Sequence, residues 1–192
     1  MTALIAGLAI FLGMHSIHIV APVWRVAQVK RFGENGWKGI YSLASVIGFV
    51  LLVWGYGQAR MDPVVLWEPA RGLRHLSALF MLPAFILLVA AYVPGNRIKA
   101  AIGHPMTASV KLWAFAHLLA NGNLADALLF GTFLLWGVMS FVTGRKRDRI
   151  SGKIYPVGSA SRTLITIIVG TAIFALFSGY LHVRLIGVPP FG

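Results

Sequence analysis

The sequence predicts an all-α protein, a polytopic membrane helix bundle of about six transmembrane helices that forms one domain over residues 1–192. Hydrophobic residues make up 58% of the chain and charged residues only 11%, whereas a soluble domain carries about a quarter charged residues. Apolar stretches close to the ~20 residues that a membrane-spanning helix needs recur along the chain. Basic residues gather between these stretches. The chain is therefore expected to lie in a lipid bilayer.

The first predicted span runs over Thr2–Ala21 and ends before Pro22. Because no basic residue precedes it, we interpret it as a retained helix and not as a cleaved signal peptide. Residues 23–32 carry regularly spaced valines and suit a helix that lies along the membrane interface. The second span covers Gly39–Gly57, and residues 58–74 then form a loop or a short interfacial helix.

The third span covers His75–Val93 and contains Pro83, which is expected to kink it. The fourth span, Pro105–Ala120, is the shortest. Its proline suits the first turn of a helix, where the missing N–H costs nothing. The fifth and sixth spans cover Leu124–Val142 and Thr163–Leu185.

Basic residues are distributed unevenly between the two sides of this arrangement. Thirteen of the 17 lysines and arginines lie in the alternate loops 22–40, 95–111 and 145–162. The positive-inside rule places these loops in the cytoplasm and both termini on the opposite side. The net charge of +12 is then a property of loops that face anionic lipid, and a nucleic-acid partner is not expected.

Two histidines, His15 and His117, lie inside predicted spans. An ionisable side chain within a bilayer is costly and marks a functional site by default, and histidine is the commonest metal ligand. At 1.5 Å per residue, the two lie roughly 9 and 18 Å from the cytoplasmic ends of their helices. The alternative is that each imidazole simply forms a hydrogen bond with a neighbouring helix.

The remaining polar residues offer less chemistry. His104 precedes Pro105 at a helix entrance, where it would bind an anion or cap the turn. The chain has no cysteine, which excludes disulfides, thiolate haem ligands and iron–sulfur clusters. The five acidic residues all fall in loops or at helix ends, so no buried carboxylate pair is expected: Glu34, Asp62, Glu68, Asp126 and Asp148.

Four segments resemble the NnrU family, and the likeness covers nearly the whole chain. They are Gly13-Met14-His15-Ser16, residues 88–95, His104-Pro105-Met106 and residues 111–122. The family is named for an association with nitrite and nitric oxide metabolism in denitrifying bacteria. It is related to zeta-carotene isomerase, an integral membrane enzyme that uses haem b and changes its iron ligation with redox state. The resemblance implies a multi-pass protein of the bacterial inner membrane, for which the positive-inside rule predicts both termini in the periplasm.

The resemblance also implies a ligand set. The isomerase's haem-ligating histidines stand in contexts similar to His15-Ser16 and to Trp113 through His117. At Ala114 the isomerase has a cysteine that is proposed as an alternate ligand, so that ligand exchange is impossible in this chain. Our leading hypothesis is that haem b binds between His15 and His117, both as cofactor-binding and as metal-ligating residues. The catalytic residues cannot be named from the sequence.

Three functions follow from these expectations. The first is a haem protein that acts in nitrite or nitric oxide metabolism or as a haem-dependent cis–trans isomerase of a lipophilic polyene. The second is a non-enzymatic accessory or assembly factor with a nitrogen-oxide reductase as its partner. The third is a membrane methyltransferase with a cytoplasmic site near His104, which Gly103 disfavours because related sequences carry an arginine there.

Overall fold

We analysed a computed structural model, which describes residues 1–190 except for the side chain of Arg71. The protein is helical, and the elements follow one another as α1 (Thr2–Val20), α2 (Pro22–Ala59), α3 (Arg71–Tyr92), α4 (Arg97–Ile102), α5 (Pro105–Ala120), α6 (Leu124–Ile150), α7 (Ala160–Leu176), the π-helical turn η1 (Phe177–Leu181) and α8 (His182–Ile186). The expected all-α membrane bundle is confirmed.

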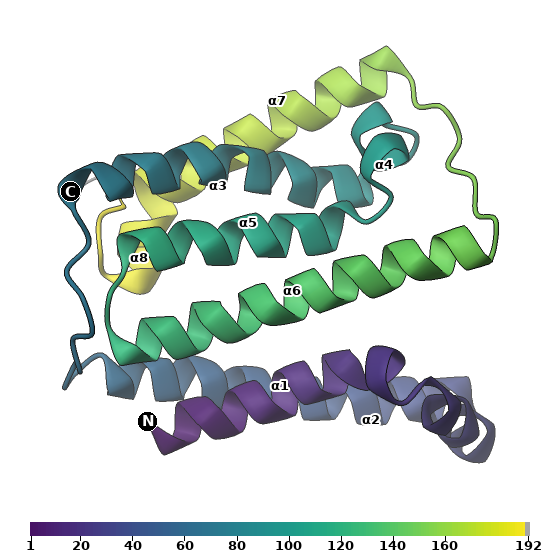
Figure 1. Ribbon diagram of the computed structural model, residues 1–192, viewed down its shortest axis with the longest axis horizontal. Coiled ribbons are helices and arrows are strands. Elements are labelled where there is room, and N and C mark those ends of the chain that lie inside the picture. The colour runs from purple at the N-terminus through teal and green to yellow at the C-terminus, as the bar shows by residue number, and fades with distance from the viewer. Residues whose placement is uncertain (191–192) are drawn as a thin grey trace.

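The six predicted spans coincide with six helices of the structure. Five helices are long and apolar enough to cross a membrane: α1, α2, α3, α6 and the continuous segment Ala160–Ile186. The sixth, α5, has only 16 residues, which amounts to about 24 Å of helix. It runs alongside α3 and α6 in the bundle (Figure 1). The protein is therefore a multi-pass membrane protein.

The helices form an open row. The α1–α2 hairpin packs against α6, α6 against α5, α5 against α3, and α3 against α7 (Figure 1). The first turn of α1 and the last helix, α8, lie on the same side of the bundle, at the left in Figure 1. The three basic loops lie on the other side of the bundle, at the right in Figure 1, and we call this side the basic end. The alternation predicted from the sequence is thus present in the fold.

Two features of the helices differ from the sequence expectation. Residues 22–59 form one kinked helix in which Gly33 has φ 73° and ψ 166°, so the expected interfacial segment is the first arm of α2. Glycine tolerates this conformation because it has no Cβ. The sixth span is also interrupted, since η1 inserts a π-helical turn before α8. Such turns are frequent at functional sites.

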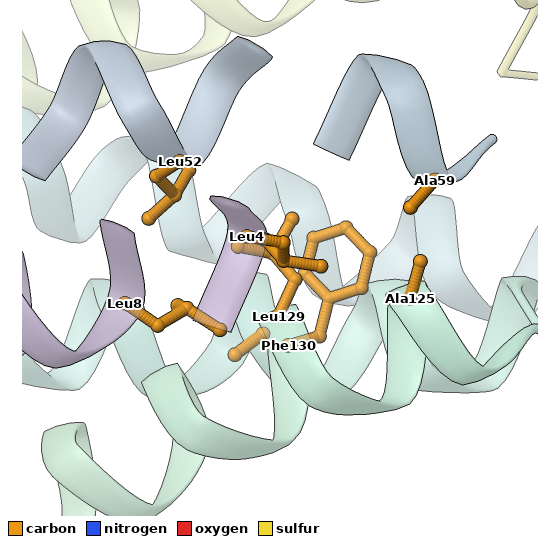
Figure 2. Close-up of a cluster of buried hydrophobic side chains, with 8 residues drawn as sticks. Leu4, Leu8, Leu52, Ala59, Ala125, Leu129 and Phe130 are labelled. Carbon is orange, nitrogen blue, oxygen red and sulfur yellow. The ribbon is translucent and has the colours of Figure 1, made fainter. Parts of the chain in front are cut away.

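The core lies where α1, α2 and α6 meet, and it depends on small residues. Leu4, Leu52, Leu129 and Phe130 point toward one another there (Figure 2). A Cβ on Gly7 would lie 2.3 Å from the backbone nitrogen of Leu52. The backbones of α1 and α2 therefore touch, as they do in membrane helix pairs built on small residues. This contact fixes the position of α1 and the residues it carries.

Candidate functional site

His15 lies on α1, and its own helix holds its ring. Its Nδ1 lies 2.7 Å from the carbonyl oxygen of Phe11, one turn earlier. The Phe11 ring lies 4.2 Å from the imidazole, and the Tyr41 ring of α2 lies 5.3 Å away. Because a carbonyl oxygen can only accept, this contact makes Nδ1 the protonated donor.

His117 on α5 repeats this arrangement. Its Nδ1 lies 2.8 Å from the carbonyl oxygen of Trp113, and the Phe130 ring of α6 stacks on it at 4.6 Å. Within residues 1–190, the Nε2 atom of neither imidazole forms a hydrogen bond. An imidazole whose Nδ1–H is held by a carbonyl presents Nε2 as a lone-pair donor, which is how metal-ligating histidines are commonly oriented.

The structure does not bring His15 and His117 into contact. Among the described residues α1 does not pack on α5, and α6 contacts both helices. His15 lies beside Trp136 of α6, with ring centres 6.2 Å apart, whereas His117 lies beside Phe130. Six residues of helix separate these two neighbours, which amounts to about 9 Å along the axis of α6.

Aromatic side chains fill the region between the two imidazoles. The ring of Phe133 lies 6.0 Å from that of Phe11 and 5.4 Å from that of Trp113. Phe11 in turn contacts His15, and the Trp113 ring lies 5.3 Å from that of His117. We call Phe11, Phe133 and Trp113 the aromatic bridge, because they join the histidines by ring contacts.

This geometry provides the donor atoms of a bis-imidazole haem site but does not place them around one metal. The two free Nε2 atoms suit the donor chemistry of an iron. Two imidazoles on one metal need both nitrogens within about 2 Å of it, as in other metal–imidazole bonds. An offset of about 9 Å along α6 and an intervening aromatic bridge do not allow this in the observed conformation. Such a site requires the helices to shift and the bridge to open.

Comparison of the sequence with known protein families identifies the family of this chain. The sequence model of the family described as NnrU protein matches residues 3–190. The chain belongs to the NnrU family. No curated protein and no solved structure matches it.

The NnrU fold contains a buried carboxylate that the sequence did not reveal. Asp126 lies at a helix end, as expected, in the first turn of α6, but it is only 2% exposed. It accepts a hydrogen bond from the Tyr56 hydroxyl at 2.5 Å and forms a capping box with Asn123. The Asn-x-x-Asp spacing before an apolar run is a signal for the capping box. No local signal could identify Tyr56, which lies 70 residues away.

The other histidines take different roles. His104 makes no capping hydrogen bond at the start of α5 and instead contacts Asp148, so it does not cap the turn by its side chain. His182 follows η1, and its Nδ1 lies 2.7 Å from the Val188 carbonyl oxygen. His75 is exposed at the start of α3. In the described chain, no group of three or more His, Asp or Glu side chains could hold a metal ion.

Two further polar atoms near His15 lack partners. The indole Nε1 of Trp136 and the hydroxyl of Ser140 are buried without a hydrogen bond in the described part of the protein. They lie one turn apart on α6, and the indole contacts His15. An unpaired buried polar group costs about 1–3 kcal/mol. The surroundings of His15 are therefore more polar than the hydrophobic sequence of α1 indicates.

Proposed function

We propose that this NnrU protein is a membrane haem protein in which His15 and His117 ligate haem b. The proposal rests on the two intramembrane imidazoles whose Nε2 atoms form no hydrogen bond while their Nδ1 atoms are held by carbonyls. In a bilayer no water is available to satisfy such an atom, so a ligand that accepts the lone pair removes an energetic cost.

Residues of this chain would supply the binding and the surroundings. His15 and His117 would hold the iron once the helices had shifted and the aromatic bridge between the two imidazoles had opened. The haem would supply redox chemistry at a site from which the bilayer excludes water. That chemistry suits a role in nitrite or nitric oxide metabolism or in the isomerisation of a lipophilic polyene, with a nitrogen-oxide reductase as a possible partner in the first case.

The absorption spectrum of the purified protein tests the proposal. Wild-type protein in detergent, expressed with sufficient haem, should show a Soret band in both the oxidised and the reduced state. His117→Ala and His15→Ala should each lose the haem or convert it from a six-coordinate to a five-coordinate species. His75→Ala removes an exposed imidazole and serves as the matched control. A wild-type protein without a Soret band refutes the proposal, as does a spectrum that His117→Ala leaves unchanged in a folded protein.

We further propose that the basic end faces the cytoplasm of a bacterium and that both termini are periplasmic. The bias of 13 in 17 basic residues toward that end supports this orientation. The chain contains no cysteine, so single-cysteine variants report the topology directly. In intact cells a membrane-impermeant maleimide should label Met61→Cys and should spare Lys146→Cys, and the reverse pattern refutes this orientation.

A further inference from the structure

A groove at the basic end is built from residues that the haem proposal does not use. It lies where α3 ends, α4 passes and α5 begins, and its volume is about 270 Å³. Its wall includes Lys99, His104, Tyr92 and Met106. The groove therefore combines a cation and an imidazole with apolar side chains.

The imidazole of His104 is held rigidly. Its Nε2 lies 2.8 Å from Oδ2 of Asp148, and the same oxygen accepts a hydrogen bond from the Tyr155 hydroxyl at 2.7 Å. The ring packs against Gly144, where a Cβ would come within 2.8 Å of a ring atom. Nδ1 forms no hydrogen bond within the described residues. Nε2 is engaged by Asp148, so Nδ1 is the ring nitrogen that remains for a ligand.

Lys99 supplies the second donor. Its Nζ donates to the carbonyl oxygen of Ala91 at 2.8 Å, at the end of α3. An ammonium group has three N–H donors, so two remain after this bond. The amine is thereby fixed beside the groove while it keeps its charge and most of its donors.

The charge around the groove is positive. Arg145 lies next to Gly103, with its Nη1 3.5 Å from the carbonyl oxygen of Ile102. The carboxylate of Asp148 is already engaged by His104, Tyr155 and Lys153, the last at 3.9 Å. Burial and the hydrogen bond to Asp148 raise the pKa of Tyr155, so this phenol stays a neutral donor. The Asp148 carboxylate therefore already has partners within this cluster. Lys99 and His104 line the groove, and Arg145 lies beside it at Gly103.

The apolar part of the wall points to an amphipathic ligand. Tyr92 is 72% exposed at the last turn of α3, and Met106 of α5 also lines the groove. Both belong to helices that run into the bilayer. A ligand that placed a phosphate between Lys99 and His104 would have hydrocarbon beside Tyr92 and Met106. We propose that this groove binds the phosphate group of an anionic lipid, with Lys99 and His104 as its hydrogen-bond donors.

Binding of short-chain lipids to the full-length protein in detergent tests this proposal. Dioctanoyl phosphatidic acid should bind saturably. Dioctanoyl phosphatidylcholine, which has the same chains but a zwitterionic headgroup, should bind at least tenfold more weakly. Inorganic phosphate should compete only at much higher concentration. Equal binding of the two lipids overturns the proposal, and binding of inorganic phosphate as tight as that of the lipid overturns the lipid assignment.

Variants locate the site. Lys99→Gln keeps a donor for the Ala91 carbonyl but removes the charge, and it should weaken phosphatidic acid binding at least tenfold, with recovery in Lys99→Arg. His104→Gln should weaken it to a similar extent. Lys146→Gln removes one exposed charge from the same end and should change the affinity less than twofold. An equal loss in Lys146→Gln, or no loss in a folded Lys99→Gln, shows non-specific attraction and overturns the site.

Discussion

The close contact between α1 and α2 allows one stability prediction to be worked through in detail. A Cβ added at Gly7 would lie 2.3 Å from the Leu52 nitrogen and 2.7 Å from its Cα. Both are backbone atoms, so no side chain can rotate away. Ordinary contact begins at 3.4 Å, and Gly7→Ala must therefore separate the two helices locally by about 1.1 Å, the difference between these distances.

The energetic consequence has two parts. Overpacking of this kind costs about 1–3 kcal/mol, and a separation near 1 Å forfeits a quarter to a half of each dispersion contact across the interface. Alanine gains up to about 1 kcal/mol over glycine in a helix. Gly7→Ala should thus be destabilised by about 1–2 kcal/mol. Gly13→Ala on the same helix, with nothing within 4 Å of the new Cβ, should be stabilised by up to about 1 kcal/mol.

Unfolding in detergent micelles titrated with sodium dodecyl sulfate, followed by circular dichroism, measures both variants under identical conditions. Gly55 provides an independent repeat, because its Cβ would lie 2.2 Å from the Leu4 nitrogen, whereas that of Gly57 meets nothing within 4 Å. Equal stability of Gly7→Ala and Gly13→Ala would refute the close backbone contact. The double variant Gly7→Ala/Gly55→Ala should cost less than the sum of its parts, since one separation of the helices accommodates both methyl groups.

Substitutions at three further positions test individual contacts, each by the same unfolding measurement unless stated otherwise. Tyr56→Phe removes the donor to buried Asp126 and should destabilise by about 1.5–3 kcal/mol; a change below 0.5 kcal/mol, on the order of a neutral surface substitution, would contradict a buried bond. Asn96→Ala should cost about 2 kcal/mol or more, because Asn96 donates to the Ala90 and Val93 carbonyls and caps α4. Asn96→Asp keeps the cap but faces the carbonyls with acceptors, so it should be no better. Phe133→Ala opens the aromatic bridge and should raise haem occupancy while it lowers stability; unchanged occupancy would show that the bridge is no obstacle.

The positions of the helices could be predicted from the sequence because bilayer thickness and hydropathy determine them. Pro22 and Pro105 each begin a helix, at α2 and α5, as expected for residues that lack an N–H. The alternation of basic loops also appears in the fold. The positive φ of Gly33 and the π-helical turn could not be predicted, since each arises from packing between segments and has no composition of its own.

The residues of the candidate site could be proposed from the sequence, but their contacts could not. The hydropathy of α1 and α5 singles out His15 and His117, but the bonds of their Nδ1 atoms and the aromatic bridge depend on how each helix is rotated. His104 illustrates the same limit. Its partner Asp148 is 44 residues away. Asp148 belongs to a basic segment whose composition indicates only the membrane topology of the chain.

The offset of the two histidines connects these observations. The depths estimated from the sequence, roughly 9 and 18 Å, already differ by the distance that separates Trp136 from Phe130 along α6. Tilting of a helix therefore does not remove this difference in depth, and a ligand shared by the two histidines requires one helix to slide along another. The backbone contacts at Gly7 and Gly55 make the α1–α2 hairpin one body. Side chains join this body to α6, at Phe11 and Phe133 and through the Tyr56–Asp126 hydrogen bond. Movement of the whole hairpin along α6 to bring His15 level with His117 must break the Tyr56–Asp126 hydrogen bond. A cross-link between α1 and α6 should abolish any ligation that needs this movement.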